Sequence, residues 1–365
     1  SCILAPTEIL ANQHFKSLSE LLIDYDVKVD LLTGSSKTRE RNLIHSSLLS
    51  GKTNILVGTH AILEDVVKFK NLGLSIIDEQ HRFGVAQRAK LWKKNNPAPH
   101  ILVMTATPIP RTLAMSLYGD LDISYIKELP PGRITTKTVH KYDRNRLSVF
   151  KFLKDQINKG RQIYLVYPLI NESEKLDYKD LMDGYESIVR EFPRPDFQVS
   201  IVHGKMKAKD KDYEMKRFIN KETQILVSTT VIEVGVNVPN ASVMVIESAE
   251  RFGLSQLHQL RGRVGRGNDE SYCVLMTKDK LSEDSKLRIE TMVKVSDGFK
   301  LAEVDLKLRG PGDLLGTRQS GMLRFKLADI VYDTEILNNA RNSAIKILNT
   351  DPRLSKNENL PIRDE

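Results

Sequence analysis

The sequence has few cysteines and no long apolar run, and each lack excludes a class of protein. Cys2 and Cys273 are the only cysteines among the 365 residues, so neither a disulfide framework nor a cysteine zinc site is expected. No apolar run approaches the roughly 20 residues that a membrane span needs. The first residues also lack the basic stretch and cleavage site of a secretory signal. These lacks predict a cytoplasmic protein with no membrane contact.

The composition is that of a globular protein with an excess of positive charge. Hydrophobic residues make up 40% of the chain and charged residues 28%, which is close to the average for soluble proteins. The length predicts more than one domain. A formal net charge of +8 permits a polyanionic partner such as nucleic acid, because clustered Lys and Arg can neutralise phosphates. An ordinary soluble surface would account for the same charge.

Short apolar runs alternate with amphipathic stretches, which predicts an α/β fold with parallel sheets. In the first part of the chain the expected strands are residues 2–5, 55–57, 74–77 and 101–104. Two prolines and a glycine within residues 128–133 favour an extended linker, after which the alternation restarts. In the second part the expected strands are residues 163–166, 199–202, 225–227, 243–246 and 272–275.

The pattern predicts three parts, with an α/β domain over residues 1–127, a second over 134–280 and a helical element over 281–365. Residues 172–194 are charged and are expected to form a surface helix and loop. In the third part, a helix is expected over residues 282–303 and another over 333–348. The Gly310-Pro311-Gly312 sequence between them predicts a loop.

An acidic sequence, Asp78-Glu79-Gln80-His81, follows the expected strand at residues 74–77. Parallel α/β sheets bind ligands at the carboxyl ends of their strands, so this position suits a nucleotide. Asp78 can hold Mg²⁺, while Glu79 can orient and deprotonate the water that attacks a phosphate. Taken alone, so short a motif favours an ordinary acidic turn.

The arginine-rich sequence from Gln259 to Arg266, QLRGRVGR, is the sharpest signal in the chain. Arg263 and Arg266 lie three residues apart and are expected on one face of a helix, where both can reach the same phosphate. An arginine that reaches a γ-phosphate from a second domain stabilises the transition state and ties hydrolysis to domain closure. The alternative is a basic solvated helix, which does not require glycines at these positions.

Small and hydroxyl residues near other strand ends are candidates for contacts with sugar and phosphate, which hold a strand without reading its bases. In the first part they are Pro6-Thr7, Thr33-Gly34, Thr59-His60 and Thr105-Ala106-Thr107. The hydroxyls of Thr105 and Thr107 are expected to relay the state of the nucleotide to a bound strand. In the second part, Thr229, Thr230, Gly235 and Asn237 suit either the nucleotide or the nucleic acid. Each of these sequences is an ordinary turn when taken alone.

Taken in order, these motifs cover nearly the whole chain and resemble the two RecA-like motor domains of superfamily 2 helicases. Longer strings look like the RecG family of branch-migrating DNA helicases. They are residues 5–11 (APTEILA), 78–85 (DEQHRFGV) and 104–113 (MTATPIPRTL). Residues 308–321 (LRGPGDLLGTRQSG) are similar to a translocation motif that this family shares with the transcription-repair coupling translocase. That resemblance implies that Arg309, Arg318 and Gln319 couple motor closure to duplex movement.

The family resemblance also implies cofactors and partners. ATP and Mg²⁺ are the implied cofactors, and branched and duplex DNA and a single-strand-binding protein are the implied partners of a monomeric motor. Nucleotide contacts are implied for Asp78, Glu79, Gln259, Gly235 and Asn237. The family usually has Asp where this chain has Asn237, so an expected carboxylate becomes an amide that can still accept a hydrogen bond.

The chain has no Gly-x-x-x-x-Gly-Lys-Ser/Thr sequence, the loop with which such motors hold the phosphates of ATP. Gly51-Lys52-Thr53 does not fit, because Ser46 occupies the first glycine position and the tripeptide precedes a strand. We therefore expect a fragment that lacks the phosphate loop and the family's amino-terminal wedge domain. By itself it is expected not to sustain ATP hydrolysis.

Other interpretations stay open from the sequence. The motor of the transcription-repair coupling translocase has a similar tail and similar motifs. A non-catalytic module would bind DNA in a salt-sensitive way that is indifferent to ATP. An RNA helicase of the same superfamily fits less well, because the tail resembles a duplex-DNA translocation element.

Overall fold

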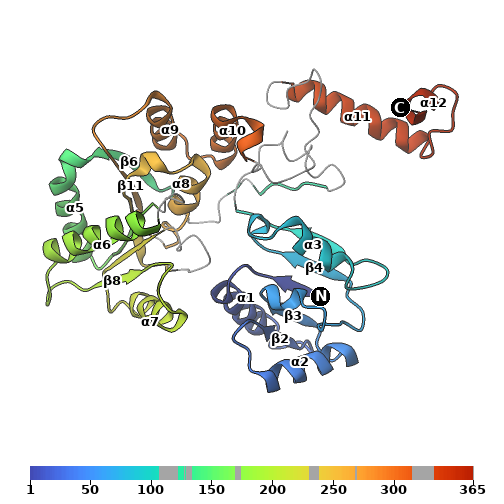
Figure 1. The fold of residues 1–365 in the computed structure, drawn as a ribbon, viewed down its shortest axis with the longest axis horizontal. Helices are drawn as coiled ribbons and strands as arrows, with labels where there is room; N and C mark the ends of the chain where they lie inside the picture. The colour runs from blue at the N-terminus through green and yellow to red at the C-terminus, as the bar shows by residue number, and fades with distance from the viewer. Residues whose placement is uncertain are drawn as a thin grey trace. The chain divides into compact units, whose positions relative to one another are not determined.

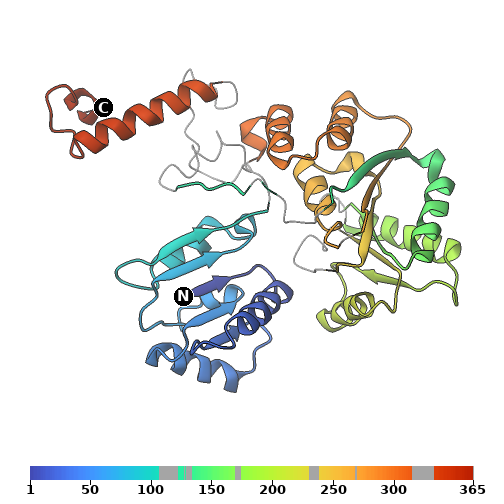
Figure 2. The same ribbon diagram turned by 180° about the vertical axis from the view of Figure 1, so that it is seen from behind.

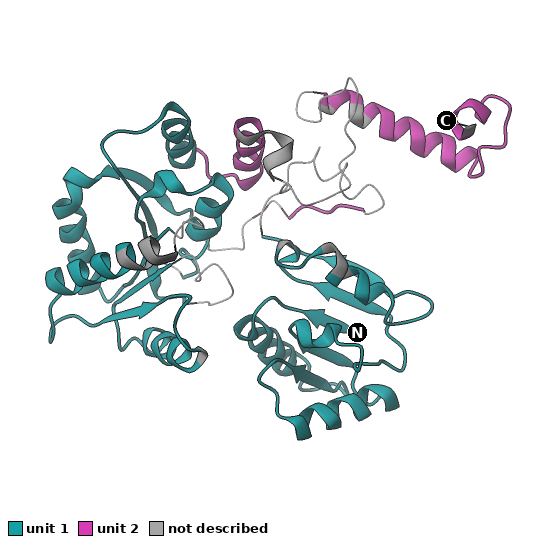
Figure 3. Cartoon of the chain, in the orientation of Figure 1, with its two compact units in different colours: residues 1–107, 130–294 teal, residues 108–129, 295–365 magenta. Residues whose placement is uncertain are grey.

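The computed structural model (Figure 1) describes residues 1–106, 122–126, 128, 134–168, 174–229, 238–267, 269–314 and 333–364. Two separate parallel sheets, each with its own helices, can be followed in Figure 1 and from behind in Figure 2. The chain divides into two compact units, residues 1–107 with 130–294 and residues 108–129 with 295–365 (Figure 3). Of the helices described, none has the length and apolar character that crossing a membrane requires.

The first sheet has five strands in the order β2-β3-β1-β4-β5, all parallel. Its strands are β1 (Cys2–Leu4), β2 (Val29–Leu32), β3 (Ile55–Gly58), β4 (Leu74–Ile77) and β5 (His100–Val103). They are connected by α1 (Glu8–Leu21), α2 (Thr38–Ser50), η1 (His60–Leu63), η2 (Gln80–Arg82) and α3 (Val85–Trp92). The apolar runs predicted as strands are confirmed, and β2 is a strand that the apolar pattern did not predict.

Helices on both faces of this sheet bury the alternate residues of its strands. Ile3 of β1 packs with Ala11 of α1, whereas its neighbour Leu4 packs with Leu48 of α2 on the opposite face. This alternation follows from the period of two residues in a strand. Both faces are therefore closed by helices, and the strand ends are left for polar residues.

The second sheet has six parallel strands in the order β6-β11-β10-β7-β9-β8. Its strands are β6 (Lys137–Tyr142), β7 (Gln162–Tyr167), β8 (Val199–Val202), β9 (Ile225–Thr229), β10 (Ala241–Ile246) and β11 (Tyr272–Thr277). Its helices are η3 (Asp143–Asn145), α5 (Arg146–Asn158), α6 (Glu174–Glu191), α7 (Ala208–Ile219), η5 (Ala249–Arg251) and α8 (Leu254–Arg261). The predicted strands of this part are again confirmed.

Helix α6 confirms the helix predicted within residues 172–194 and shows that one of its faces is buried. The helix is present, but Leu181 and Ile188 are fully buried in a core that also contains Leu153 of α5 and Leu165 of β7. Most other described residues of α6 are polar. The charged composition of the segment therefore gave no sign of this apolar face.

Further helices follow β11 in the described chain. They are α9 (Glu283–Lys294), α10 (Gly298–Leu314), α11 (Thr334–Thr350) and α12 (Leu360–Asp364). The prediction of one helix over residues 282–303 is wrong, because the carboxylate of Asp297 accepts a hydrogen bond from the Phe299 amide at 2.8 Å and starts a new helix. The predicted loop at residues 310–312 is also wrong, since α10 continues to Leu314. In the second unit, Tyr125 packs edge-on against Phe299 with ring centroids 5.2 Å apart.

Candidate functional site

The polar residues predicted at the strand ends of the first sheet lie along one edge of that sheet. Each follows a strand, and all the strands are parallel, so their carboxyl ends meet at the same edge. Pro6 and Thr7 follow β1, Thr33 and Gly34 follow β2, Thr59 and His60 follow β3, residues 78–81 follow β4, and Thr105 follows β5. The predicted placement of these residues is therefore confirmed, while their roles stay predictions.

Asp78 at the end of β4 contacts a residue that the motifs did not predict. His14 Nε2 of α1 lies 2.8 Å from Asp78 Oδ2, and both side chains are partly buried. The Asp78 amide donates to the Leu4 carbonyl at 2.9 Å, which fixes the backbone beside β1. A single histidine on an amphipathic helix gives no sequence signal for such a contact.

Glu79 has a left-handed backbone conformation, with φ 50° and ψ 53°. A side chain in this region costs about 1–2 kcal/mol, so residues other than glycine adopt it rarely. The Glu79 carboxylate accepts a hydrogen bond from the Ala106 amide at 3.3 Å, and the amide of the buried Gln80 donates to the Met104 carbonyl at 3.3 Å. The ends of β4 and β5 are thereby joined, and Thr105 lies between the two contacts.

Two of the predicted threonines, Thr7 and Thr59, have hydroxyls in different local settings. Thr7 caps α1, since its hydroxyl accepts a hydrogen bond from the Leu10 amide at 3.3 Å. Thr59 is buried, and its hydroxyl has no hydrogen-bond partner among the described residues. His60, which follows it, is exposed. These two hydroxyls are therefore poorer candidates for contact with a nucleic-acid strand than exposed backbone groups are.

The structure corrects the expected arrangement of Arg263 and Arg266 on one helical face. Helix α8 ends at Arg261, and both arginines lie in the turn that follows it. Gly265 has a φ of 75°, which an L side chain rarely adopts. Arg263 is only 8% exposed, while Arg266 is exposed and its Nε lies 3.4 Å from the Gly262 carbonyl. Gln259, also predicted as a nucleotide contact, is half-buried on α8.

This arginine turn, residues 262–267, lies at the amino-terminal edge of the second sheet. A Cβ atom at Gly265 would come within 2.9 Å of the hydroxyls of Thr136 and Ser271, which precede β6 and β11. Thr229 ends β9 at the opposite edge, and its buried hydroxyl has no partner in the described chain. The structure therefore does not bring Thr229 and the two arginines together.

The charges of the arginine turn affect the pKa of a buried tyrosine, Tyr164. Burial raises the pKa of Tyr164, and the nearby positive charges of Arg263 and Arg266 oppose that shift. The Tyr164 hydroxyl has no hydrogen-bond partner among the described residues.

Arg261 has a structural role that the motif analysis left unassigned. It is 7% exposed, and its Nη1 donates to the Met292 carbonyl of α9 at 3.1 Å. Burial lowers the pKa of the guanidinium. Arg261 thus joins the helix that carries the arginine turn to the last turn of α9.

Another ion pair supports the carboxyl edge of the second sheet. Arg146 of α5 makes a two-fold contact with the buried carboxylate of Glu247, at 2.6 and 2.8 Å. Hydrogen bonding to this carboxylate raises the pKa of Arg146 above its already high range. Glu247 follows β10, so the pair fixes the start of α5 beside the end of that strand.

Several predicted residues lie outside the described parts of the chain. They are Thr107, Thr230, Gly235, Asn237, Arg318 and Gln319. Arg309 lies in α10 and His81 in η2, but their side chains are not among those described.

The described residues fit a magnesium ion that is shared with a nucleotide. They contain no group of three or more His, Cys, Asp or Glu side chains that could hold a metal. Mg²⁺ is commonly held by one or two carboxylates together with phosphate oxygens and water. Asp78 and Glu79 supply that number of carboxylates at one strand end.

A phosphate cradle is not present in the sequence, and the nearest pattern has another role. Gly51 ends α2 in a left-handed conformation, and the Thr53 hydroxyl bonds to Ser47 and Asp30. Gly51-Lys52-Thr53 is therefore a structural turn before β3. The given sequence thus contains no Gly-x-x-x-x-Gly-Lys-Ser/Thr loop for the β- and γ-phosphates of ATP.

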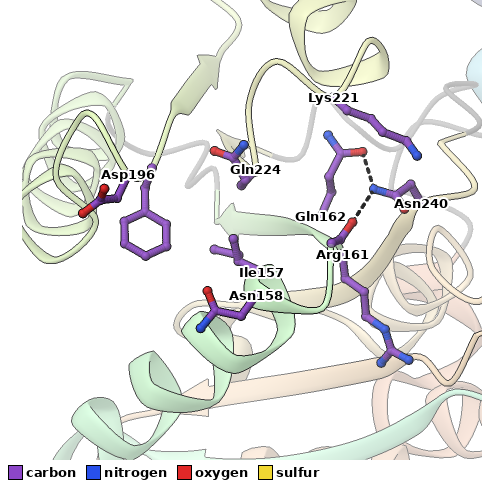
Figure 4. Close-up of a pocket in the computed structure, with 10 residues that line it drawn as sticks. Ile157, Asn158, Arg161, Gln162, Asp196, Lys221, Gln224 and Asn240 are labelled. Atoms are coloured by element: carbon purple, nitrogen blue, oxygen red, sulfur yellow. Dashed lines mark hydrogen bonds between the residues drawn. The ribbon is translucent and has the colours of Figure 1, made fainter.

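A polar cavity of about 610 Å³ lies at the amino-terminal edge of the second sheet, and none of the predicted site residues lines it (Figure 4). It is lined by Arg161, Gln162, Lys221, Gln224 and Asn240, among others. The amide of Asn240 donates to the Gln162 side chain and the Gly160 carbonyl, each at 3.1 Å. These lining amides are thus already paired with one another.

Comparison with protein families gives three matches in chain order. Residues 1–116 match the DEAD/DEAH box helicase model, residues 148–268 the helicase conserved C-terminal domain, and residues 295–363 the model for ATP-dependent DNA helicase RecG, domain 3, C-terminal. The first two matches lie on the two parallel sheets, and the third lies on α10 to α12.

The chain is similar along its whole length to ATP-dependent DNA helicases named RecG. The relative from Synechocystis sp. is 50% identical over 100% of this chain and 43% of its own length. The relative from Bacillus subtilis is 49% identical over 100% of this chain and 53% of its own length. The chain therefore spans about half the length of the curated relatives it matches.

Solved structures agree with this similarity. The structure of RecG bound to a three-way DNA junction matches 92% of this chain and 43% of that chain, with a TM-score of 0.73 and 42% identity. Dbp5 from S. cerevisiae, bound to RNA and ADP BeF3, matches 85% of this chain and 81% of that chain with a TM-score of 0.57. At 14% identity, the Dbp5 match shows the fold alone.

The two parallel sheets and the helicase models matched to them define a superfamily 2 helicase motor with two RecA-like domains. Because the third model and the relatives at about half identity agree, the chain belongs to the RecG family of ATP-dependent DNA helicases and corresponds to part of its members' length.

Proposed function

We propose that this chain is the motor portion of an ATP-dependent helicase and translocase that acts on branched DNA. In the complete protein it would remodel replication forks and Holliday junctions during recombination and repair. The observation that carries the proposal is the edge of the first sheet, where the Asp78 and Glu79 carboxylates lie at the end of β4, beside the ends of the other parallel strands. The three-way junction in the structure of a RecG relative supports branched DNA as substrate.

Within this proposal, each of the described residues has its own role in ATP hydrolysis by the complete protein. Asp78 would hold Mg²⁺, and His14 fixes the orientation of that carboxylate. Glu79 would orient the attacking water. Its hydrogen bond from the Ala106 amide links the position of this carboxylate to that of the segment after β5. Bound Mg²⁺ would supply stabilisation of charge on the transferred phosphoryl group.

Arg263 and Arg266 are proposed to neutralise developing phosphate charge, as arginine fingers do in related motors. Gln259, Gly235 and Asn237 stay proposed nucleotide contacts. Thr105, Thr107, Thr229 and Thr230 are proposed to respond to the nucleotide. Arg309, Arg318 and Gln319 are proposed to couple that response to the duplex.

For the chain by itself we propose DNA binding without ATP hydrolysis. The sequence contains no loop that could hold the β- and γ-phosphates, while its net charge of +8 favours a polyanion. ATP and Mg²⁺ are cofactors of the complete protein, which we propose to be cytoplasmic and monomeric. A single-strand-binding protein is a proposed partner.

Fluorescence anisotropy tests DNA binding directly. A labelled three-way junction, a duplex and a single strand of matched sequence would be titrated with the chain at several salt concentrations. We expect the junction and duplex to bind more tightly than the single strand, with affinity that falls linearly on a logarithmic salt scale. Failure to bind any of the three at low salt would contradict the proposal.

A non-catalytic DNA-binding module is the second candidate, favoured by the missing phosphate loop. It predicts that ATP and its analogues leave DNA affinity unchanged, because no nucleotide binds. The motor proposal predicts the same for this chain but not for a longer protein that contains the loop. Nucleotide-dependent affinity in that longer protein would therefore exclude the binding module.

A further inference from the structure

The loop after β2, residues 33–36, is held by charged side chains from two helices. Glu8 of α1 accepts hydrogen bonds from the amide and the hydroxyl of Ser35, both at 2.9 Å. Arg41 of α2 donates to the Thr33 carbonyl at 2.8 Å and to the Ser36 carbonyl at 3.2 Å. Charge-assisted bonds of this kind are stronger than neutral ones, so the loop is fixed from both sides.

Bonds within the loop complete this arrangement. The Thr33 amide donates to the Ser36 hydroxyl at 3.0 Å, and the Thr33 and Ser35 hydroxyls lie 3.0 Å apart. Gly34 is exposed, and its amide has no acceptor among the described residues. A Cβ atom at Gly34 would lie 3.2 Å from a Glu8 carboxylate oxygen, so glycine suits this close approach.

We propose that Glu8 and Arg41 are positioning residues, which hold the 33–36 loop so that the Gly34 amide faces a phosphodiester of a bound DNA strand. The inference rests on the proposed function, in which this sheet edge contacts the sugar-phosphate backbone. An exposed amide can bind phosphate without reading sequence. A loop that is already ordered loses little conformational entropy when the strand binds.

The contacts of the two side chains favour positioning over direct DNA contact. Arg41 also donates to Glu64 at 3.3 Å, so all three guanidinium nitrogens have protein acceptors. Glu8 carries a negative charge, which repels phosphate. Its presence beside a phosphate contact is explained by the Ser35 bonds that it accepts.

Replacement of Glu8 distinguishes a positioning role from a simple effect of its charge on DNA binding. Loss of a carboxylate makes the chain more positive, so charge alone predicts tighter DNA binding. Positioning predicts that Glu8→Ala weakens duplex binding about five- to tenfold, because the loop loses its support. Glu20→Ala is the matched control, since Glu20 is an exposed carboxylate on the same helix that pairs only with Lys16 among described residues.

Arg41 provides a second, independent comparison. Arg41→Lys keeps the charge but loses the planar fork that reaches two carbonyls at once. We expect it to weaken DNA binding several-fold with an unchanged salt slope, whereas Arg39→Lys, at an exposed position in the first turn of the same helix, should bind normally. Normal binding by Arg41→Lys would show that only its charge matters and would overturn the assignment of Arg41.

Amide hydrogen exchange without DNA tests the positioning step by itself. We expect the Ser35 amide to exchange faster in Glu8→Ala than in Glu20→Ala, and equal exchange would overturn the inference whatever the DNA result. If the Glu20→Ala chain binds DNA and Glu8→Ala binds it as tightly, this inference fails and the proposed function stands. If the unaltered chain binds no DNA, the proposed function fails and the inference fails with it.

Discussion

His14 Nε2 lies 2.8 Å from Asp78 Oδ2, and this contact joins α1 to the strand end that carries the proposed magnesium ligand. We predict a coupling free energy of about 0.5–1.5 kcal/mol between the two side chains, the usual range for a hydrogen bond in a partly buried site. Urea unfolding of His14→Ala, Asp78→Ala and the double variant gives the coupling. Additive effects would show that the contact contributes nothing.

The left-handed conformation of Glu79 predicts an unusual effect of glycine. Both Glu79→Ala and Glu79→Gly remove the carboxylate and its bond to the Ala106 amide. Glycine alone adopts a φ of 50° without steric cost. The free energy of unfolding should therefore be about 1 kcal/mol higher for Glu79→Gly than for Glu79→Ala. The reverse order would contradict a strained backbone at this site.

Arg261 should stabilise the junction between α8 and α9. Replacement by Met leaves the buried Met292 carbonyl without its donor, which costs about 1–3 kcal/mol. Thermal unfolding and hydrogen exchange in α9 would measure the loss. Arg251→Met is the control, because Arg251 is exposed and its Asp180 partner lies 3.8 Å away. Equal effects of the two substitutions would count against this role.

The turn after α11 should depend on pH through Asp351. Its carboxylate accepts hydrogen bonds from Asn359 and from the amides of Lys356 and Ser355, and these bonds hold the pKa of Asp351 well below its usual value. Since the folded pKa lies below the unfolded one, the stabilisation is complete above the unfolded pKa, near 3.8, and is lost as pH falls toward the folded pKa.

Amide exchange at Ser355 and Lys356 on acidification follows this loss. We expect protection to fall below pH about 4 in the unaltered chain, and to be low already at neutral pH in Asp351→Ala. Protection that does not change with pH in the unaltered chain would contradict the stabilising role of the carboxylate.

Most strands could be predicted from sequence, including the edge strands β5 and β8, but β2 and β6 could not. Central strands such as β7 and β10 are almost wholly buried and read as continuous apolar runs. Strand β2 lies at an edge of the first sheet and β6 at an edge of the second. Their sequences, VDLL and KTVHKY, mix polar and apolar residues, so neither forms the continuous apolar run from which the other strands were predicted.

The site was predicted as a set of strand ends, but its local geometry was not. The position of Asp78 and Glu79 follows from strand period and topology, which the sequence encodes locally. The end of α8 before Arg263 was signalled by Gly262 and Gly265, yet the three-residue spacing favoured a helix. His14, Glu8 and Arg41 act through contacts with residues distant in sequence, and one sequence shows no such pairing.

The central claim is that the chain holds the carboxylates and arginines of an ATPase site without the loop that binds the phosphates. DNA-stimulated phosphate release by the purified chain, with Glu79→Gln measured in parallel, tests it most directly. We predict the same background release from both chains, with and without branched DNA. Release that DNA stimulates in the unaltered chain and that Glu79→Gln abolishes would contradict the account.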